Sequence, residues 1–79
     1  MSQADLQIEE QERIAALSQR EREVLVLLAE GLSAKEIASR LNIAESTTGV
    51  HLTRIYEKLG VNKAVNAVRS AIRGGLIEA

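Results

Sequence analysis

Two copies of the pattern Ser-x-x-Glu, fifteen residues apart, constrain this chain more than any other feature. Ser18 pairs with Glu21 in the first copy, and Ser33 with Glu36 in the second. The hydroxyl of each serine can accept a hydrogen bond from the glutamate's N–H, and the carboxylate can accept one from the serine's N–H. Such a capping box starts a helix, and Gly31 suits the left-handed residue that follows a helix end. The boxes therefore predict two helices joined by a tight turn.

The periodicity of the apolar residues predicts four helices in all. The first is expected over about 19–30, and the second is short. The third covers about 45–59, where inward positions recur at intervals of four, three and four: Thr48, Leu52, Ile55 and Leu59. The fourth covers about 63–73 and has an inward side formed by Ala64, Ala67, Val68 and Ala71. Leu76 and Ile77 are expected to fold back onto the core.

Composition favours an all-α fold and excludes several kinds of site. The chain has no Cys and one His, His51, so it offers neither a disulfide nor a zinc site made by protein ligands alone. Proline is absent and Tyr56 is the one aromatic residue, while Leu, Ile, Val and Ala supply the apolar content, as in packed helices. The longest apolar stretch, 24–29, is far shorter than the roughly 20 residues that span a bilayer. We expect a cytoplasmic protein with no membrane segment, metal or cofactor.

Charge divides the chain into two segments. Residues 1–17 contain four acidic residues and one arginine, a net charge of −3, whereas the rest has nine Lys and Arg against seven Glu, a net charge of +2. The apolar residues of the first segment follow no clean helical register. We therefore expect an acidic, partly helical tail or linker over 1–16, frayed at its start, and one all-α domain over 17–79.

A short helix, a tight turn and a longer helix are typical of a helix-turn-helix, whose second helix enters the major groove of DNA. Ala38 is small where the two helices would cross, and Ile43 can fill the turn between them. A generic three- or four-helix bundle is the alternative, because amphipathic helices and short loops are common to both.

The same residues resemble the LuxR-type DNA-binding domain, which occurs alone in small sporulation regulators and as the output domain of bacterial response regulators. The resemblance covers about 17–77, and its matching segments are Leu17–Leu25, Leu28–Ala38, Leu41–Thr47, His51 and Lys58–Val61. It implies a bacterial transcriptional regulator, not an enzyme, that binds double-stranded DNA as a homodimer, with RNA polymerase as a further candidate partner. No recognisable spacing of catalytic side chains argues otherwise.

Three positions depart from the family's pattern. Ala44 replaces the usual hydroxyl cap before the third helix, so that Ser46 or Thr47 would have to cap it. Gly49 stands where the family usually has a lysine, and Ala64 stands where it usually has an arginine, with Lys63 alongside as a substitute.

Candidate phosphate contacts come from the residues and from the resemblance. Ser33 and Lys35 lie at a predicted helix N-terminus, where free N–H groups and the helix dipole favour an anion. An ordinary cap followed by a solvated lysine is the alternative. The resemblance adds Thr47, Arg54, Lys58 and Lys63, although Lys58 could equally pair with Glu57 or Glu23.

The resemblance also maps base reading onto the outward face of the third helix, formed by Ser46, Gly49, Val50 and Thr53. None of these is charged. Val50 and the Thr53 methyl can contact a thymine methyl, and the hydroxyls can bond a donor or an acceptor, so that direct readout is expected to be permissive.

A second stripe on the fourth helix consists of Val65, Arg69 and Ile72. LuxR-type domains pair through this helix, so the resemblance implies a dimer surface here; scattered surface residues are the alternative. A second function also stays open, namely a protein-interaction module that keeps the fold with weak or no DNA affinity. Gly49, Ala64 and the acidic segment favour it.

Overall fold

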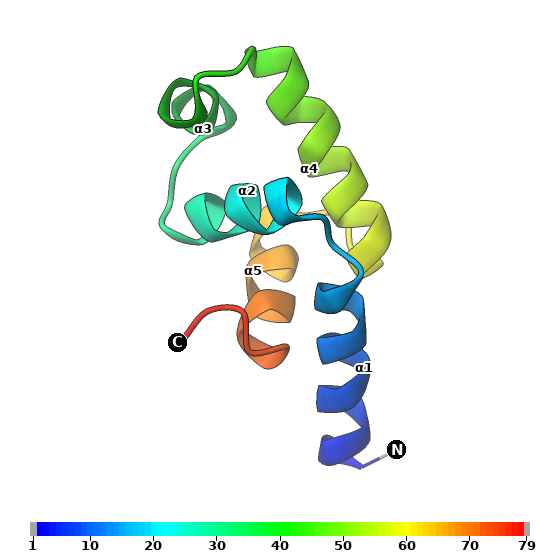
Figure 1. Ribbon diagram of the computed structural model, residues 1–79. Coiled ribbons are helices and arrows are strands. Elements are labelled where there is room, and N and C mark those ends of the chain that lie inside the picture. The colour runs from blue at the N-terminus through cyan, green and yellow to red at the C-terminus, as the bar shows by residue number, and fades with distance from the viewer. Residues whose placement is uncertain (1, 79) are drawn as a thin grey trace.

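The computed structural model describes residues 2–78, and within them the chain forms five α-helices and no strand. The helices are α1 (Gln3–Ala15), α2 (Gln19–Ala29), α3 (Ala34–Leu41), α4 (Glu45–Leu59) and α5 (Ala64–Arg73). α2 lies in the middle of the molecule, with α3 and α4 on one side and the antiparallel pair α1 and α5 on the other (Figure 1). The all-α fold class predicted from the sequence is confirmed.

Local signals fix where the central helices begin and end. Both capping boxes form, with the backbone N–H of Glu21 and of Glu36 donating to the serine hydroxyl at 3.1 and 3.2 Å. Asn42 and Gly60, both left-handed, end α3 and α4. α4 differs at its start: Ala44 is its N-cap, and no side chain caps the helix. The expected substitute caps, Ser46 and Thr47, lie inside its first turn.

The acidic segment differs from the expected frayed tail. It forms α1, which begins with a third capping box between Ser2 and Asp5. The helix packs against α5 and α4, burying Ile14 and the carboxylate-bearing Glu10. Leu17, which follows α1, is also buried. This burial stabilises a helix whose thin apolar stripe would not hold it in isolation.

The core forms where α2 crosses α4 and α5. Its fully buried members are Val24 and Leu25 of α2, Ile37 of α3, Ile55 and Leu59 of α4, and Ala67 and Ala71 of α5. Ala64 was expected on this inward face but is exposed, because it is the first residue of α5 and the buried side of the helix begins one turn later.

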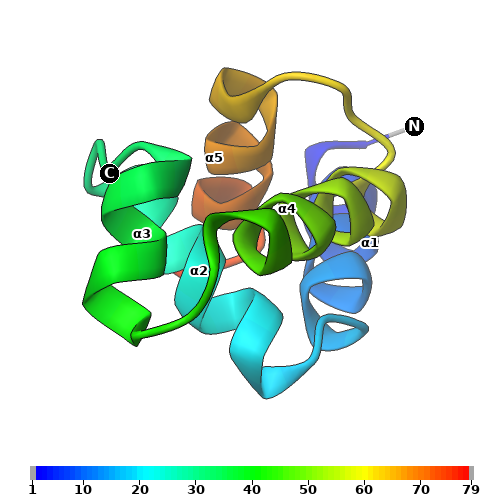
Figure 2. The ribbon, with the colours of Figure 1, turned by 90° about the horizontal axis from the view of Figure 1, so that it is seen from above.

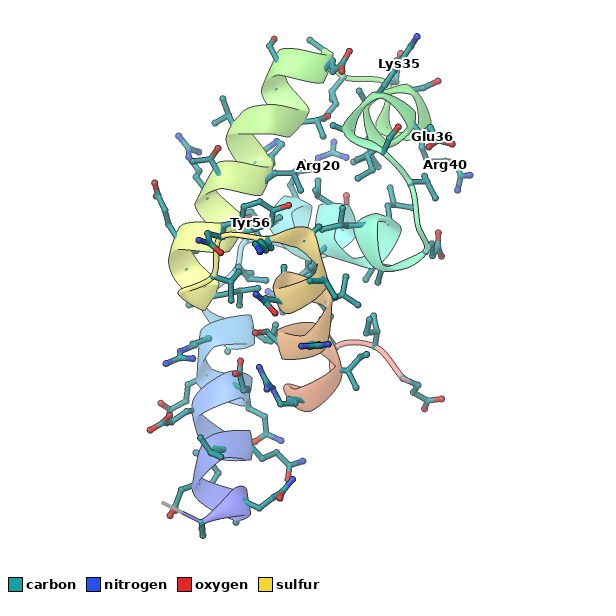
Figure 3. All side chains as sticks on the ribbon, turned by 180° about the vertical axis from the view of Figure 1, so that it is seen from behind. Arg20, Lys35, Glu36, Arg40 and Tyr56 are labelled. Atoms are coloured by element: carbon teal, nitrogen blue, oxygen red, sulfur yellow. The ribbon has the colours of Figure 1, made fainter. Side chains whose placement is uncertain are left out.

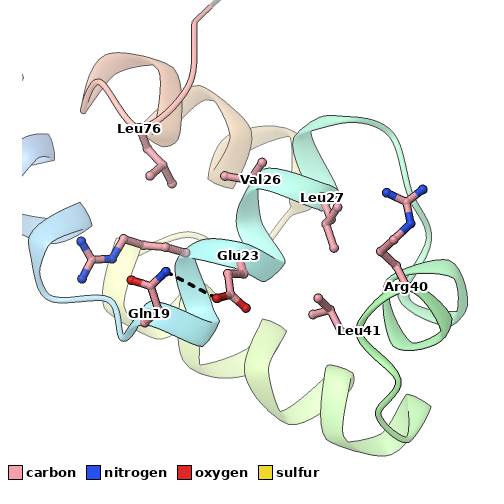
Figure 4. A pocket seen from close by; sticks show the side chains of 8 residues that line it. Gln19, Glu23, Val26, Leu27, Arg40, Leu41 and Leu76 are labelled. Carbon is pink, nitrogen blue, oxygen red and sulfur yellow. Dashed lines mark hydrogen bonds between the residues drawn. The ribbon is translucent and has the colours of Figure 1, made fainter.

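The C-terminal segment folds back as predicted. The N–H of Leu76 donates to the carbonyl of Ala71 at 2.9 Å, and both Leu76 and Ile77 pack against the core. Leu76 also lines a groove of about 440 Å³ with apolar residues of α2 and α3 (Figure 4). Polar residues border the groove, and among them Gln19 donates a hydrogen bond to Glu23 at 3.4 Å.

Gly74 sets how closely α1 approaches the end of α5. A Cβ atom at this position would lie 2.6 Å from Cγ1 of Ile14 and 3.0 Å from the carbonyl oxygen of Glu10. Gly74→Ala should therefore push α1 away and lower the free energy of unfolding by roughly 1–3 kcal/mol, the usual cost of overpacking. Urea denaturation followed by circular dichroism measures this change. An unchanged midpoint would mean that α1 does not pack against α5 in solution.

Candidate nucleic-acid interface

α3 and α4 form a helix-turn-helix. α3 lies beside the start of α4, which crosses the middle of the face turned toward the viewer (Figure 2). Ile37 and Ala38 of α3 are buried against this contact, and the N–H of Ile43 in the turn donates to the carbonyl of Ala38 at 3.0 Å. The inner face of α4, with Thr48 and Ile55 fully buried, leaves its opposite face exposed.

The outward face of α4 gathers all four residues predicted to face bases: Ser46, Gly49, Val50 and Thr53 are exposed and line one depression. Arg54 and Glu57 complete its lining. Glu57 was missed from the sequence, although its spacing of four residues from Thr53 puts both on one face. The depression is therefore mainly uncharged, with a cation and a carboxylate toward the end of the helix.

Gly49 leaves this surface bare. A Cβ atom built at this position meets nothing within 4 Å, so the packing of the protein itself does not require glycine. Gly49 nevertheless lies within α4, where glycine costs roughly 0.5–1 kcal/mol relative to alanine. If glycine is needed at position 49, the need therefore comes from a binding partner and not from the packing of this chain.

The hydrogen bonding of the Thr53 hydroxyl is more restricted in the structure than the residue type alone indicates. Its hydroxyl donates to the carbonyl oxygen of Gly49 at 3.0 Å, within the same helix. The hydroxyl proton is thus in use, and the oxygen remains free to accept. In the major groove such an acceptor suits the exocyclic amino group of adenine or cytosine.

Lys35 is exposed in the first turn of α3 and points away from the body of the molecule, at the end where α4 begins (Figure 3). Ser33 is engaged as the cap of the same helix. The hydrogen bond from the backbone N–H of Ser33, and to a smaller extent the one with its hydroxyl, lowers the pKa of Glu36. Lys35 therefore supplies the positive charge of this turn, while Glu36 is held in the capping box with Ser33.

The other predicted phosphate residues are spread more widely. Thr47 and Arg54 are exposed on α4. Lys63 is the N-cap of α5, beyond the end of α4, and so lies apart from the depression. Lys58 is held elsewhere: its Nζ donates to Oε1 of Glu21 at 2.7 Å and to the carbonyl of Ala16 at 3.3 Å. This arrangement corrects the predicted pairing of Lys58 with Glu57 or Glu23, because the ammonium links α4 to the α1–α2 junction.

The Lys58–Glu21 pair predicts a stability change with pH. Burial raises the pKa of Glu21, but the bond from Lys58, the bonds from Ser18 and the charge of Lys58 together lower it. A lowered pKa stabilises the fold above the ordinary value of about 4.3, and that contribution is lost as the pH falls through the folded-state pKa. Between about pH 5 and 3, Glu21→Gln should thus flatten the decline of the melting temperature. A decline identical to wild type would exclude the pair as its source.

The remaining predicted residues lie outside the depression. Val65, Arg69 and Ile72 are all exposed on α5, with 55% of Val65 and 36% of Ile72 accessible. Tyr56 packs against the core beside α5 (Figure 3). His51 is half-buried, and its Nδ1 has no hydrogen-bond partner among the described residues.

Comparison with known proteins agrees with this geometry. Residues 15–71 match the family described as bacterial regulatory proteins, luxR family. The chain is 48% identical over 62 residues to the probable transcriptional regulatory protein NarL of Mycobacterium tuberculosis, and 47% identical over 58 residues to the nitrate/nitrite response regulator protein NarP of Escherichia coli. These matches cover 78% and 73% of this chain but 29% and 27% of the two regulators.

A solved structure shows the same fold. The crystal structure of response regulator ChrA, from a heme-sensing two-component system, superposes with a TM-score of 0.76 at 45% identity, over 78% of this chain and 31% of that one. The chain thus spans less than a third of the relatives it matches here. None of its described helices is long and apolar enough to cross a membrane.

Proposed function

This chain belongs to the luxR family of bacterial regulatory proteins, and we propose on that basis that it binds double-stranded DNA as a transcriptional regulator. α4 lies in the major groove in this proposal. The observation that carries it is the exposed outward face of α4, where Ser46, Gly49, Val50 and Thr53 line one depression while the inner face is buried.

Phosphate contacts position the domain in this proposal. Lys35 projects at the end where α4 begins, and Thr47 and Arg54 are exposed along α4. Such contacts fix the register of a protein on the duplex without reading sequence. Val50, half exposed, supplies an apolar contact for a thymine methyl, and the shape of the duplex contributes the rest of the specificity.

Pairing through α5 completes the proposed arrangement. The exposed stripe of Val65, Arg69 and Ile72 would join two copies and present two copies of α4 to half-sites about one DNA turn apart. A protein-interaction module is the competing function. Glu57 in the depression favours it, because a carboxylate there repels DNA phosphates.

Salt dependence separates the two functions. Binding to mixed duplex DNA should weaken with a slope of log K against log[salt] of about −0.9 per phosphate neutralised. Lys35→Ala should reduce the size of that slope by about 1 and weaken binding to all sequences by similar factors. Fluorescence anisotropy of a labelled duplex measures both. Affinity that is absent at low salt would favour the interaction module.

Thr53→Val is the matched change on the reading face. It keeps the size and one methyl of threonine but removes the acceptor oxygen, so it should alter the preference among sites selected from a random pool. Lys35→Ala should leave that preference unchanged. The reverse pattern, with Lys35 setting preference and Thr53 without effect, would show that α4 does not lie in the groove as proposed.

A further inference from the structure

The two ends of the chain pack together outside the segment that matches the family. The match covers residues 15–71, whereas α1 ends at residue 15 and the last residues of α5 follow residue 71. Nη2 of Arg73 lies 3.3 Å from Oε1 of Glu10 in an ion pair, and Gly74 allows Ile14 to approach closely. α1 is therefore an integral part of this domain, fixed on the helix proposed for pairing.

α1 brings an apolar side chain to the pairing face of α5. Leu6 and Ile72 line one cavity of about 390 Å³, bordered by Gln3, Gln7 and Arg73. Both apolar residues remain accessible to solvent, with 49% of Leu6 and 36% of Ile72 exposed. Since Ile72 also belongs to the stripe that contains Val65, the exposed apolar residues of the two helices are continuous.

The two helices carry opposite charge. α1 contains Asp5, Glu9, Glu10 and Glu12 against one arginine, a net charge of −3, whereas α5 contains Arg69 and Arg73 and no acidic residue, a net charge of +2. Among the described residues, Glu10 with Arg73 is the one ion pair that joins them. Asp5 caps its own helix, whereas Glu9, Glu12 and Arg69 form no ion pair among the described residues and can attract a second surface of the same kind.

The size that a stable interface needs also favours a surface made of both α1 and α5. Specific protein interfaces bury about 800 Å² per partner and engage about 20–30 residues on each side. One face of α5, a helix of ten residues, falls well short of this. α1, with thirteen residues beside it, extends the surface. A two-fold axis would place the acidic side of each α1 near the basic α5 of the other copy, so that each complementary contact is made twice.

We propose that α1 forms part of the dimer surface of this protein, with a second copy of the chain as its partner. In this dimer, Leu6 joins Val65 and Ile72, and the carboxylates of α1 face Arg69 of the other copy. The proposal rests on the proposed pairing through α5 and adds a second helix to it. It does not depend on DNA binding, because the surface lies on α1 and α5.

Sedimentation equilibrium of the full chain tests the proposal with a matched pair of variants. Leu6→Glu should raise the dimer dissociation constant at least tenfold. Ile8→Glu is the control, since Ile8 lies on the same helix with 52% exposed but does not line the cavity; it should change the constant less than twofold. Circular dichroism checks that helicity is kept, and Leu6→Gln repeats the test without an added charge.

Ile72→Glu separates the proposal from the pairing on which it rests. If Ile72→Glu weakens the dimer but Leu6→Glu and Leu6→Gln act no more strongly than Ile8→Glu, α1 is not part of the interface and pairing through α5 stands. If Ile72→Glu has no effect, or the wild-type chain stays monomeric up to about 1 mM, pairing through α5 and the role of α1 are both overturned. A loss of DNA binding alone bears on neither.

Discussion

Ile55→Ala should lower the free energy of unfolding by roughly 2–5 kcal/mol, the usual cost of deleting a buried aliphatic side chain. Ile55 has no exposed surface and belongs to the core cluster, to which all five helices contribute. Small domains are stable by about 5–15 kcal/mol in total, so this one change should remove a large share of the stability. Urea denaturation followed by circular dichroism gives the value.

Val50→Ala is the matched control for Ile55. Both residues are on α4, but Val50 is 50% exposed on the outward face, and its truncation should change stability by less than about 0.5 kcal/mol. The comparison also tests the functional assignment. If Ile55→Ala cost under 1 kcal/mol, or Val50→Ala cost as much, α4 would be rotated about its axis and the depression would not be its solvent face.

Local signals made the middle of the fold predictable. α4 was expected over 45–59 and has those bounds, because inward residues recur with the helical period and Gly60 supplies the left-handed end. α2 and α3 follow their capping boxes in the same way. Each of these features depends on residues within about four positions of one another, which is the range over which a sequence reports structure directly.

α1 was less predictable because its stability comes from distant contacts. Its acidic composition and irregular apolar spacing indicated a frayed tail, although Ser2 and Asp5 carry the same capping signal as the later helices. The contact that secures the helix joins Ile14 to Gly74, sixty residues away. The sequence shows that a glycine lies near the chain end. It does not show that this glycine permits a close contact, or which residue makes that contact.

In the candidate interface, too, features set by local spacing were predictable and features set by distant contacts were not. Helical spacing placed Ser46, Gly49, Val50 and Thr53 on one face, and the structure brings them into one depression. The pairing of Lys58 with Glu57 or Glu23 was wrongly predicted because its actual partner, Glu21, is 37 residues away. The donation from Thr53 to Gly49 depends on a side-chain rotamer, which periodicity does not specify.

Gly49→Lys should weaken sequence-specific DNA binding about tenfold, equivalent to about 1.4 kcal/mol, despite the added positive charge. The protein leaves open space above Gly49, and the residue lines the same depression as Val50 and Thr53. Under the proposed function that space is filled by the edge of a base pair, which a side chain would displace. Gly49→Ala should therefore weaken specific binding less than lysine does, while stabilising the fold by roughly 0.5–1 kcal/mol.

The measurement is anisotropy on a duplex selected by the wild-type protein, alongside a duplex of scrambled sequence. Arg54→Gln on the same lining serves as the charge control, since losing a cation should weaken binding to both duplexes alike. Close approach at Gly49 predicts instead that lysine weakens the selected duplex more than the scrambled one. If Gly49→Lys strengthens binding to both duplexes equally, close approach at Gly49 is wrong. Position 49 then lacks a cation that would contact DNA, and this luxR-family domain binds DNA phosphates weakly because that charge is missing.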